Sequence, residues 1–420
     1  MRLRLLCILL AITGPSMAGS LPPAVDLTAQ QWFPRIIAQE GSSCAQHVGL
    51  YYMMAAEAGR STGQPTALSP YFAYTVISGS RSGRTHLTDG WLLSGEMGVP
   101  SLMDSPRYST RLMDGYEKYR RALAWRADSW QIHPVMNEEQ IAAVCDRLAR
   151  GHLLGCDFQV KGTKLRTFPK GHPMAGQTII TEWSNSGPGH TMLYAGYDQT
   201  LGWDVNGDGA ITTDRDIDGD ARLTIADSER GAFLLVNPWG PRWGNRGRAW
   251  VLFRTHSLSR WARGRSVAEL TLAPPALPRR MLRISLKAAD RQNLTLRITG
   301  SRGQTVQPMI FDHRTRSPLH PSSAWDAFSH FARPGAHVSP GGLAGASGGP
   351  LEMGFDLSAA GPGPWRMDIL PVKGPLRATV TAAEVIEYAR DGQIAARWPF
   401  QAISGLPLPP AGTSWSSAQK

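Results

Sequence analysis

The hydrophobic pattern changes at Pro274-Pro275, and no other feature of the sequence constrains the fold as strongly. Downstream of these prolines, apolar residues alternate with more polar neighbours in short runs separated by Gly and Pro. Period-two alternation predicts strands with one buried face. We therefore expect an all-β sandwich domain over residues 273–404, followed by a flexible tail at 405–420. The alternating runs are Leu282–Leu286, Leu294–Ile298, Leu351–Leu357 and Trp365–Ile369.

The part before the prolines has a mixed pattern of helix signals and apolar, strand-like runs. Residues 19–272 therefore predict an α/β unit. Its first strong element is a helix over about Cys44–Ala58, which Gly59 would end. At roughly 100–200 residues per domain, a chain of 420 residues has room for two or three folding units.

Residues 1–18 predict an export signal. Arg2 and Arg4 precede the apolar stretch Leu5–Ile12, and Ser16 and Ala18 place small residues where a signal peptidase cuts. This stretch is too short to span a bilayer, and no later segment reaches the ~18 apolar residues that a transmembrane helix needs. We expect a secreted or periplasmic protein with no membrane span.

The charge of the chain is +11, from 44 basic and 33 acidic residues. Basic and acidic residues are interspersed, and no basic run is longer than a few residues. Proteins that bind nucleic acids gather their positive charge in runs or patches. We therefore expect no nucleic-acid partner.

Three cysteines remain after export: Cys44, Cys145 and Cys156. In an oxidising compartment an odd number implies one pair and one free thiol. Cys145 lies in a predicted helix over Asn137–Arg150, and Cys156 follows the turn at Gly151, so the short loop between them could close. We predict a Cys145–Cys156 disulfide worth roughly 2–3 kcal/mol, with two buried free thiols as the alternative.

Cys44 stands at the start of the first long helix. The positive end of the helix dipole lowers the pKa of a thiol at that place and favours the nucleophilic thiolate. Downstream, His190 begins one apolar strand and Asn237 ends another. A histidine can pair with the thiolate, and an asparagine can orient its ring. His47 is a rival base near Cys44, but its position favours the core or the edge of a cleft.

The segment Asn237–Gly247 matches the pattern Asn-x-Trp-Gly-x-x-Trp-Gly-x-x-Gly. With this motif, residues from about Leu21 to Arg254 resemble the papain-like cysteine peptidases, in the form of a secreted member of bacterial type. The resemblance implies an α+β, two-lobed catalytic domain, with a helical lobe and a β-barrel-like lobe. Weaker agreement comes from Val25-Asp26, Leu68-Ser69-Pro70, Asp89-Gly90-Trp91 and Gly98-Val99.

The resemblance also implies roles for single residues. Cys44 would be the nucleophile and His190 its imidazolium partner, and Asn237 would orient His190. Gln39, with the Cys44 backbone N–H, would stabilise the oxyanion, a donor of the kind worth ~3 kcal/mol in the transition state.

Two residues are assigned to substrate binding and to protection of the site. Gly90 would pair its main chain with the substrate, and Trp239 would shield the His190–Asn237 hydrogen bond from water. Two departures from the family affect the oxyanion site: Ala45 replaces the usual tryptophan after the nucleophile, and Gln39 precedes Cys44 by five residues instead of six.

An acidic insertion at 203–229 separates His190 from Asn237. Two frames within it space oxygen ligands as in a calcium loop, and Arg215 occupies the last position of the first frame, where it cannot ligate. We expect a structural calcium ion and no organic cofactor, with a solvated acidic hairpin as the alternative. The predicted ligands are Asp204, Asn206, Asp208, Asp214, Asp216, Asp218, Asp220 and Asp227.

Together these features predict a secreted cysteine endopeptidase that acts on polypeptides, with a C-terminal domain that could bind a surface or the substrate. Three alternatives stay open. The papain-like part could be a catalytically impaired binding module, or an amidase or acyl transferase acting on cell-wall peptides. A calcium-dependent adhesion protein would explain the insertion and the β domain, but not the Asn237–Gly247 motif.

Overall fold

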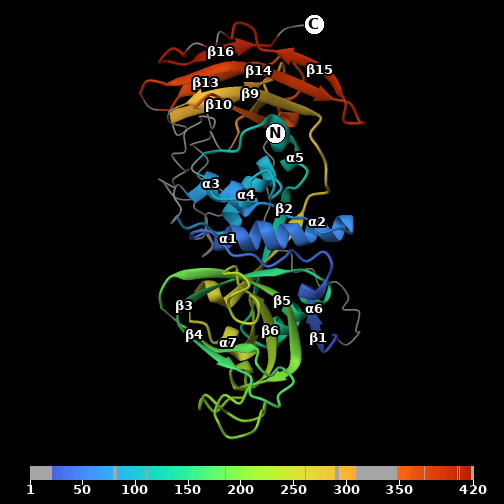
Figure 1. The fold of residues 1–420 in the computed structure, drawn as a ribbon, viewed down its shortest axis with the longest axis vertical. Coiled ribbons are helices and arrows are strands. Elements are labelled where there is room, and N and C mark those ends of the chain that lie inside the picture. Colours follow the sequence, from blue (N-terminus) through green and yellow to red (C-terminus); the bar gives the residue numbers. More distant parts are fainter. Residues whose placement is uncertain are drawn as a thin grey trace.

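The structure is a computed structural model that describes residues 21–78, 83–109, 111–184, 186–260, 262–288, 293–308, 348–372, 374–403, 405 and 407–417. The predicted export signal lies outside these ranges. Figure 1 shows three layers along the longest axis: a β-barrel, a layer of helices and a pair of β-sheets. A mixed α/β unit followed by an all-β part is thus the architecture of the chain.

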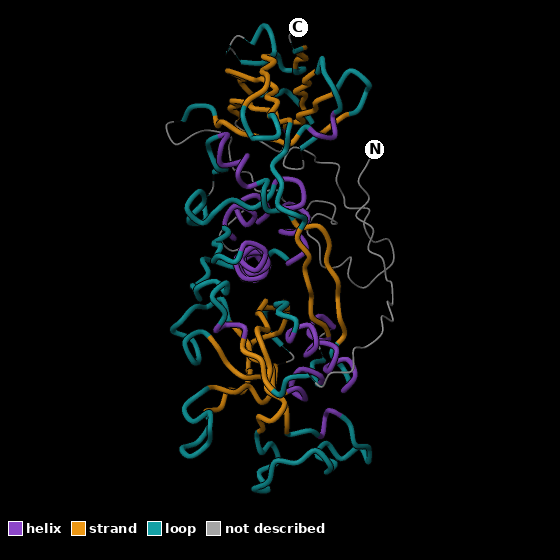
Figure 2. The backbone as a smooth tube through the Cα atoms, turned by 90° about the vertical axis from the view of Figure 1, so that its right-hand side faces the viewer, coloured by secondary structure: helices purple, strands orange, loops and turns teal. Residues whose placement is uncertain are grey.

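One long helix runs through the centre of the molecule. Figure 2 shows it end-on, with the barrel on one side and other helices of the middle layer on the opposite side. It consists of α1 (Cys44–Gln46), the π-helical segment η2 (His47–Met54) and α2 (Ala55–Thr62). The prediction that it ends at Gly59 is wrong. Gly59 instead provides close packing, because a Cβ there would come within 3.1 Å of Trp32, and Gly63 ends the helix with a φ of +69°.

The other helices are shorter and lie on both sides of the long one, some of them beside the barrel strands (Figure 1). They are α3 (Pro70–Ser78), α4 (Leu87–Met97), α5 (Tyr116–Ala122), α6 (Glu138–Ala149) and α7 (Phe253–Ser257). Short 3-10 turns are η1 (Leu27–Ala29), η3 (Ile225–Asp227), η4 (Ala262–Arg265) and η9 (Ser358–Ala360).

The first eight strands form one sheet in the order β1-β5-β6-β7-β4-β3-β8-β2. Because β3 also pairs with β5, the strands β5, β6, β7, β4 and β3 close into a barrel. The β2–β8 pair runs along one side of the molecule, beside the helices (Figure 2). The strands are β1 (Ala24–Asp26), β2 (Ala127–Pro134), β3 (Leu154–Thr167), β4 (Thr178–Ser184), β5 (Gly189–Gly202), β6 (Arg230–Val236), β7 (Arg248–Leu252) and β8 (Ser266–Leu272).

The C-terminal part contains two antiparallel four-stranded sheets, ordered β11-β10-β13-β16 and β12-β9-β14-β15. The strands are β9 (Arg280–Ala288), β10 (Leu294–Thr299), β11 (Thr305–Val306), β12 (Leu351–Asp356), β13 (Arg366–Pro371), β14 (Ala378–Tyr388), β15 (Ile394–Pro399) and β16 (Thr413–Ser416).

The alternating apolar residues of the sequence form the inner faces of these sheets. Every second residue from Leu282 to Leu286 on β9 is buried, and the same holds from Leu294 to Ile298 on β10. These side chains from both sheets belong to one core cluster. The prediction that the period-two pattern marks strands with one buried face is therefore confirmed for β9 and β10.

The predicted flexible tail at 405–420 is wrong in its middle part. Residues Thr413–Ser416 form β16, which pairs antiparallel with β13. Trp415 of this strand is buried in the same core cluster as the residues of β9 and β10. Burial of this large aromatic side chain favours the ordered strand.

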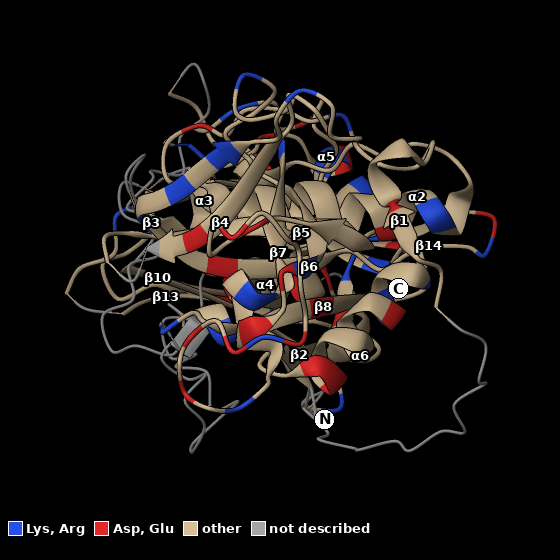
Figure 3. Ribbon diagram, turned by 90° about the horizontal axis from the view of Figure 1, so that it is seen from below, with Lys and Arg blue, Asp and Glu red and all other residues tan. Residues whose placement is uncertain are grey.

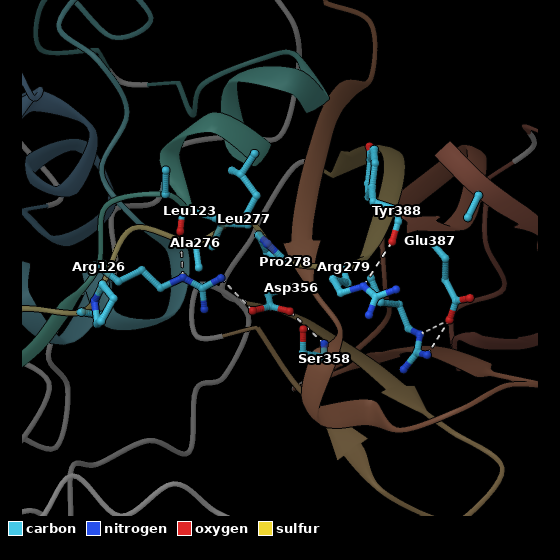
Figure 4. A pocket seen from close by; sticks show the side chains of 15 residues that line it. Leu123, Arg126, Ala276, Leu277, Pro278, Arg279, Asp356, Ser358, Glu387 and Tyr388 are labelled. Carbon is cyan, nitrogen blue, oxygen red and sulfur yellow. Dashed lines mark hydrogen bonds and ion pairs between the residues drawn. The ribbon is translucent and has the colours of Figure 1, made fainter. Parts of the chain in front are cut away.

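The C-terminal sheets are fastened to helix α5. The hydroxyls of Tyr116 and Tyr388 lie 2.7 Å apart in the buried contact between them. Figure 4 shows the pocket at this junction, where Arg126 Nη2 lies 2.8 Å from Asp356 Oδ2 and Arg279 Nε donates to the Tyr388 carbonyl at 3.4 Å. Aromatic packing and ion pairs therefore hold the C-terminal part against the helical layer.

Charged residues of both signs are spread over the barrel end of the molecule, as the view in Figure 3 shows. Among the helices of the described ranges, none has the length and apolar character that crossing a membrane requires.

Candidate active site

Cys44 is the first residue of α1, and its position depends on the turn before it. Gly41 adopts a left-handed φ of +59°, which turns the chain into the helix. The His47 N–H then donates to the Ser43 carbonyl at 3.0 Å, so the helical hydrogen bonds begin beside Cys44. The thiol is partly buried, since α1 packs against strand β5.

His190 and Asn237 come together because β5 and β6 are antiparallel neighbours. His190 is the second residue of β5, and Asn237 follows the last residue of β6. His190 Nε2 lies 2.9 Å from Asn237 Oδ1, and both side chains are buried. Asn237 Oδ1 also accepts the Trp239 N–H at 3.0 Å, which requires the oxygen to face both donors. His190 therefore carries its proton on Nε2 and leaves a lone pair on Nδ1.

Trp239 covers the histidine ring. The two rings are stacked with centroids 4.7 Å apart and planes 26° apart. Trp239 is 44% exposed, so its outer face meets solvent while its inner face lies on His190. Trp243 packs edge-on against Trp239, with centroids 6.3 Å apart. This stack keeps water away from the buried His190–Asn237 hydrogen bond.

Gln39 lies beside the same segment. Its backbone N–H donates to the Pro238 carbonyl at 2.7 Å, and Ala38 forms a β-bridge with Trp239. The Gln39 side chain turns toward Gly41, where Nε2 donates to the carbonyl at 2.8 Å. One Nε2 hydrogen is used in this bond, and Gln39 Oε1 is buried without a hydrogen-bond partner in the described part of the chain.

The Cys44 thiol meets β5 at Thr191, the residue after His190. The backbone N–H and the hydroxyl of Thr191 both act to lower the pKa of the Cys44 thiol, against the larger effect of burial. The helix start and the strand start thus converge, and Cys44, His190, Asn237, Gln39 and Trp239 gather in one place. Thr191 was missed by sequence reasoning, although a polar residue at the head of an apolar strand is a usable signal.

The pKa of the Cys44 thiol shifts in the direction opposite to the one predicted from the helix dipole. Burial raises the pKa of the Cys44 thiol, with the charge of Asp157 acting in the same direction. Burial also lowers the pKa of His190 to about 4, although the hydrogen bond that His190 donates to Asn237 acts in the opposite direction. Both shifts favour the uncharged forms, a neutral thiol and a neutral imidazole.

Gly90 packs against Gln46, the residue two positions after Cys44 on α1. It lies in helix α4 and is buried, and a Cβ at this position would overlap Gln46 Oε1. A helical glycine at such a close contact has a packing role. Main-chain pairing of Gly90 with a substrate stays a prediction.

His47 is not placed as a base for Cys44. It is fully buried, its Nδ1 lies 3.0 Å from Ser43 Oγ, and its ring packs edge-on against Tyr71 at 5.2 Å. Burial lowers its pKa to about 4.

The predicted Cys145–Cys156 disulfide is wrong, because both residues are free thiols. Cys145 lies on α6, and Cys156 lies on β3, where its Sγ is 3.4 Å from the Met192 carbonyl. Each thiol is buried in the apolar core instead of facing the other. Burial raises the pKa of both thiols, that of Cys145 to about 12.

The acidic insertion folds into two similar loops. Asp204 accepts backbone N–H groups from the residues three and five positions on, and Asp216 does the same in the second loop. Carboxylate oxygens of Asp216, Asp218 and Asp227 lie within 4.8 Å of one another. Asp227 is buried and accepts the Ile217 N–H at 2.8 Å.

The other predicted ligands are placed less compactly. Asp208 pairs with Arg215, and Asp214 and Asp220 are exposed. Asn206 lies beside Asp208, with Nδ2 donating to Oδ2 at 3.2 Å. Sequence reasoning missed Glu229, whose buried carboxylate accepts the Val205 N–H at 2.7 Å and so belongs to the first loop.

Comparison with known proteins gives weak likenesses. No protein-family model matches the chain, and no curated protein is similar to it in sequence. It is similar to three solved structures: the Amb a 11 cysteine protease of ragweed pollen in its proform, digestive procathepsin L 3 of Tenebrio molitor, and xylellain, a cysteine protease from Xylella fastidiosa.

The TM-scores of these three matches are 0.40, 0.39 and 0.38, with 13%, 13% and 16% sequence identity. The matches cover 61%, 61% and 60% of this chain. They cover 66% of the ragweed chain, 72% of the beetle chain and 87% of the bacterial chain. Likenesses at this level establish neither a family nor an activity.

Proposed function

We propose that this protein is a secreted cysteine endopeptidase with a two-lobed papain-like catalytic part and a C-terminal β-sandwich. The observation that carries the proposal is the His190–Asn237 hydrogen bond, which leaves Nδ1 of His190 as the basic nitrogen of the ring. A thiol, a base and an orienting amide are the parts that nucleophilic hydrolysis requires.

The reaction starts from the neutral pair. As Cys44 Sγ attacks a peptide carbonyl carbon, its proton passes to His190 Nδ1 and the carbonyl oxygen becomes an oxyanion. The Cys44 N–H and the second Gln39 Nε2 hydrogen stabilise that oxyanion. Collapse of this tetrahedral intermediate breaks the C–N bond and leaves a thioester on Cys44, and His190 returns the proton to the leaving amine. Water then attacks the thioester, gives a proton to His190 and releases the acid and the thiol.

Transfer of the proton during attack fits the local electrostatics. Burial disfavours both the thiolate and the imidazolium, so the ion pair forms when the substrate is attacked instead of standing ready beforehand. The stacked Trp239 keeps the imidazolium that forms in a dry environment, where its bond to Asn237 is stronger.

Calcium is a second part of the proposal. Asp216, Asp218 and Asp227 supply carboxylate oxygens, the ligands that calcium prefers. Like charges this close together repel one another unless a cation neutralises them. The ion would order the insertion between the strands that carry His190 and Asn237.

The C-terminal domain is assigned to binding, either of a surface or of the substrate. It lies against the helical layer, on the side opposite the barrel (Figure 1). Export by the segment at residues 1–18 would deliver the whole chain to a secreted or periplasmic location.

Turnover of a peptide library by residues 19–420 tests the proposal, with Cys44→Ala as the matched control. We expect cleavage by the parent chain and none by the variant. Incubation with unfolded protein and with cell-wall peptides separates an endopeptidase from an amidase. Cleavage that survives Cys44→Ala would contradict the proposal, and binding without cleavage would point to an impaired binding module.

A further inference from the structure

The junction between the helical layer and the C-terminal sheets contains a pocket of about 690 Å³, within the range of ligand-binding sites. Its walls come from the segment after α5, the linker between β8 and β9, and strands β9, β12, β14 and β15 (Figure 4). Cys44 and His190 lie on α1 and β5 instead. The pocket is therefore a second candidate site, which the proposed reaction does not use.

The charges around the pocket do not balance. Its charged lining residues are Arg126, Arg279, Arg280, Asp356 and Glu387. Arg126 Nη2 lies 2.8 Å from Asp356 Oδ2, and Arg280 Nε donates to Glu387 Oε1 at 2.6 Å. Each carboxylate is thus neutralised by one arginine. With three arginines and two carboxylates, the pocket carries one net positive charge, which belongs to Arg279.

Arg279 offers that charge to a ligand. Its side chain is exposed, and its Nε donates to the Tyr388 carbonyl at 3.4 Å, which orients the guanidinium. Among the described residues, no carboxylate forms an ion pair with it. Both Nη groups are then available, and the planar fork of a guanidinium matches the two oxygens of a carboxylate.

A wall of the same pocket is apolar. It is formed by linker residues before β9: Ala273, Pro274, Ala276, Leu277 and Pro278. Leu277 is 43% exposed, and exposed apolar residues that lie together mark binding sites. An apolar group next to the carboxylate of a ligand would cover Leu277. The charged side chains in the rest of the wall suit the amide groups of a peptide better than a plain hydrocarbon chain.

We propose that this pocket binds the C-terminal end of a peptide, with the carboxylate on Arg279 and an apolar last side chain on Leu277. The choice of a peptide rests on the proposed peptidase activity, because hydrolysis produces peptides with new C-terminal carboxylates. The C-terminal domain thereby holds peptide ends at its junction with the helical layer.

The test measures how tightly a fluorescent peptide ending in leucine binds to residues 19–420 carrying Cys44→Ala, which keeps the peptide intact. The peptide with a free C-terminal carboxylate is compared with the same peptide as its C-terminal amide. We expect the acid to bind about tenfold more tightly. Arg279→Gln should lower the affinity for the acid to that of the amide. Arg377→Gln changes an exposed arginine outside the pocket and should leave the affinity unchanged.

Leu277→Ser gives a second test if Arg279→Gln does not fold. Leu277 is already exposed, and its loss removes an apolar contact to the ligand without opening the core. The peptide acid ending in leucine should bind about threefold more weakly to this variant, whereas a peptide acid ending in glycine should bind equally well to both proteins. Equal weakening of the two peptides would contradict the assignment of Leu277.

Equal affinities for the acid and the amide would overturn the proposal, and so would equal losses in Arg279→Gln and Arg377→Gln. Displacement of the peptide by acetate at an equal concentration would indicate a site for any small anion, also against the proposal. Binding here needs no cleavage. Selective binding of the acid by a chain that hydrolyses no peptide would therefore contradict the proposed function alone, and hydrolysis without that selectivity would contradict this site alone.

Discussion

Asn237 holds His190 in a single tautomer, because Asn237 Oδ1 accepts both the His190 Nε2–H at 2.9 Å and the Trp239 N–H at 3.0 Å. Two donors on one oxygen fix the amide orientation, and the amide orientation fixes the ring. The basic nitrogen that results is Nδ1. The backbone turn after β6 thereby controls where a proton can be accepted.

Asn237→Ala should reduce kcat/KM by about tenfold, the equivalent of one lost buried hydrogen bond of about 1.4 kcal/mol. Asn237→Asp keeps an acceptor at this place and adds a negative charge, which favours the imidazolium. We therefore expect the acidic limb of its kcat/KM profile to move to higher pH. An acidic limb at the same pH in the parent and Asn237→Asp would contradict this account of the pair.

Buried histidines should make the protein less stable in acid. Burial lowers the pKa of His47 and His190 to about 4 and that of His256 to about 3. The unfolded chain binds these protons near pH ~6.5, so the free energy of unfolding is retained above that pH and falls as the pH drops toward ~4. Each histidine contributes up to about 3 kcal/mol to this loss.

Urea unfolding at several pH values from neutral to mildly acidic measures the effect. His47→Gln removes one of the three groups, and its unfolding free energy should fall less steeply with decreasing pH than that of the parent chain. Parallel pH profiles for the two proteins would show that His47 does not take part.

The free thiols of Cys145 and Cys156 predict how many cysteines react with a thiol reagent. Denatured residues 19–420, kept without reductant, should react with three equivalents of a thiol reagent, because all three cysteines are free. In the folded protein Cys145 and Cys156 should react slowly because both are buried, whereas Cys44 is partly exposed. A single reactive thiol per denatured chain would show that Cys145 and Cys156 form a disulfide after all.

Calcium should raise the melting temperature, and a chelator should lower it. Calcium at about a hundredfold above its dissociation constant stabilises the folded state by about 2.7 kcal/mol. Asp227→Asn should abolish the response, because its buried carboxylate is central to the second loop. Asp128→Asn, on β2 and outside the insertion, is the matched control and should keep it. Identical melting temperatures with calcium and with chelator would show that no calcium ion stabilises the fold.

Much of the site could be predicted from the sequence because its residues stand at element ends or in a dense motif. Cys44 begins a helix, and Asn237 and Trp239 belong to one glycine-rich pattern. Thr191 and Asp157 could not be paired in this way, because their contact depends on the register of β3 against β5.

Two errors have the same physical origin. Sequence spacing showed that Cys145 and Cys156 are close along the chain, but not the directions of their side chains, which a disulfide requires. The dipole argument for Cys44 likewise omitted burial, which raises the pKa of the thiol. The strand at 413–416 was missed because its pairing with β13 depends on residues far away in the sequence.

Alkylation of the parent chain near neutral pH tests the central claim most directly. Iodoacetamide should place one label per folded chain, on Cys44, and abolish peptide hydrolysis in proportion. His190→Ala should slow that labelling by about tenfold or more, since the base that takes the thiol proton is gone. Equal labelling rates in the parent and His190→Ala, or a label divided among Cys44, Cys145 and Cys156, would contradict the claim that Cys44 and His190 act as a pair.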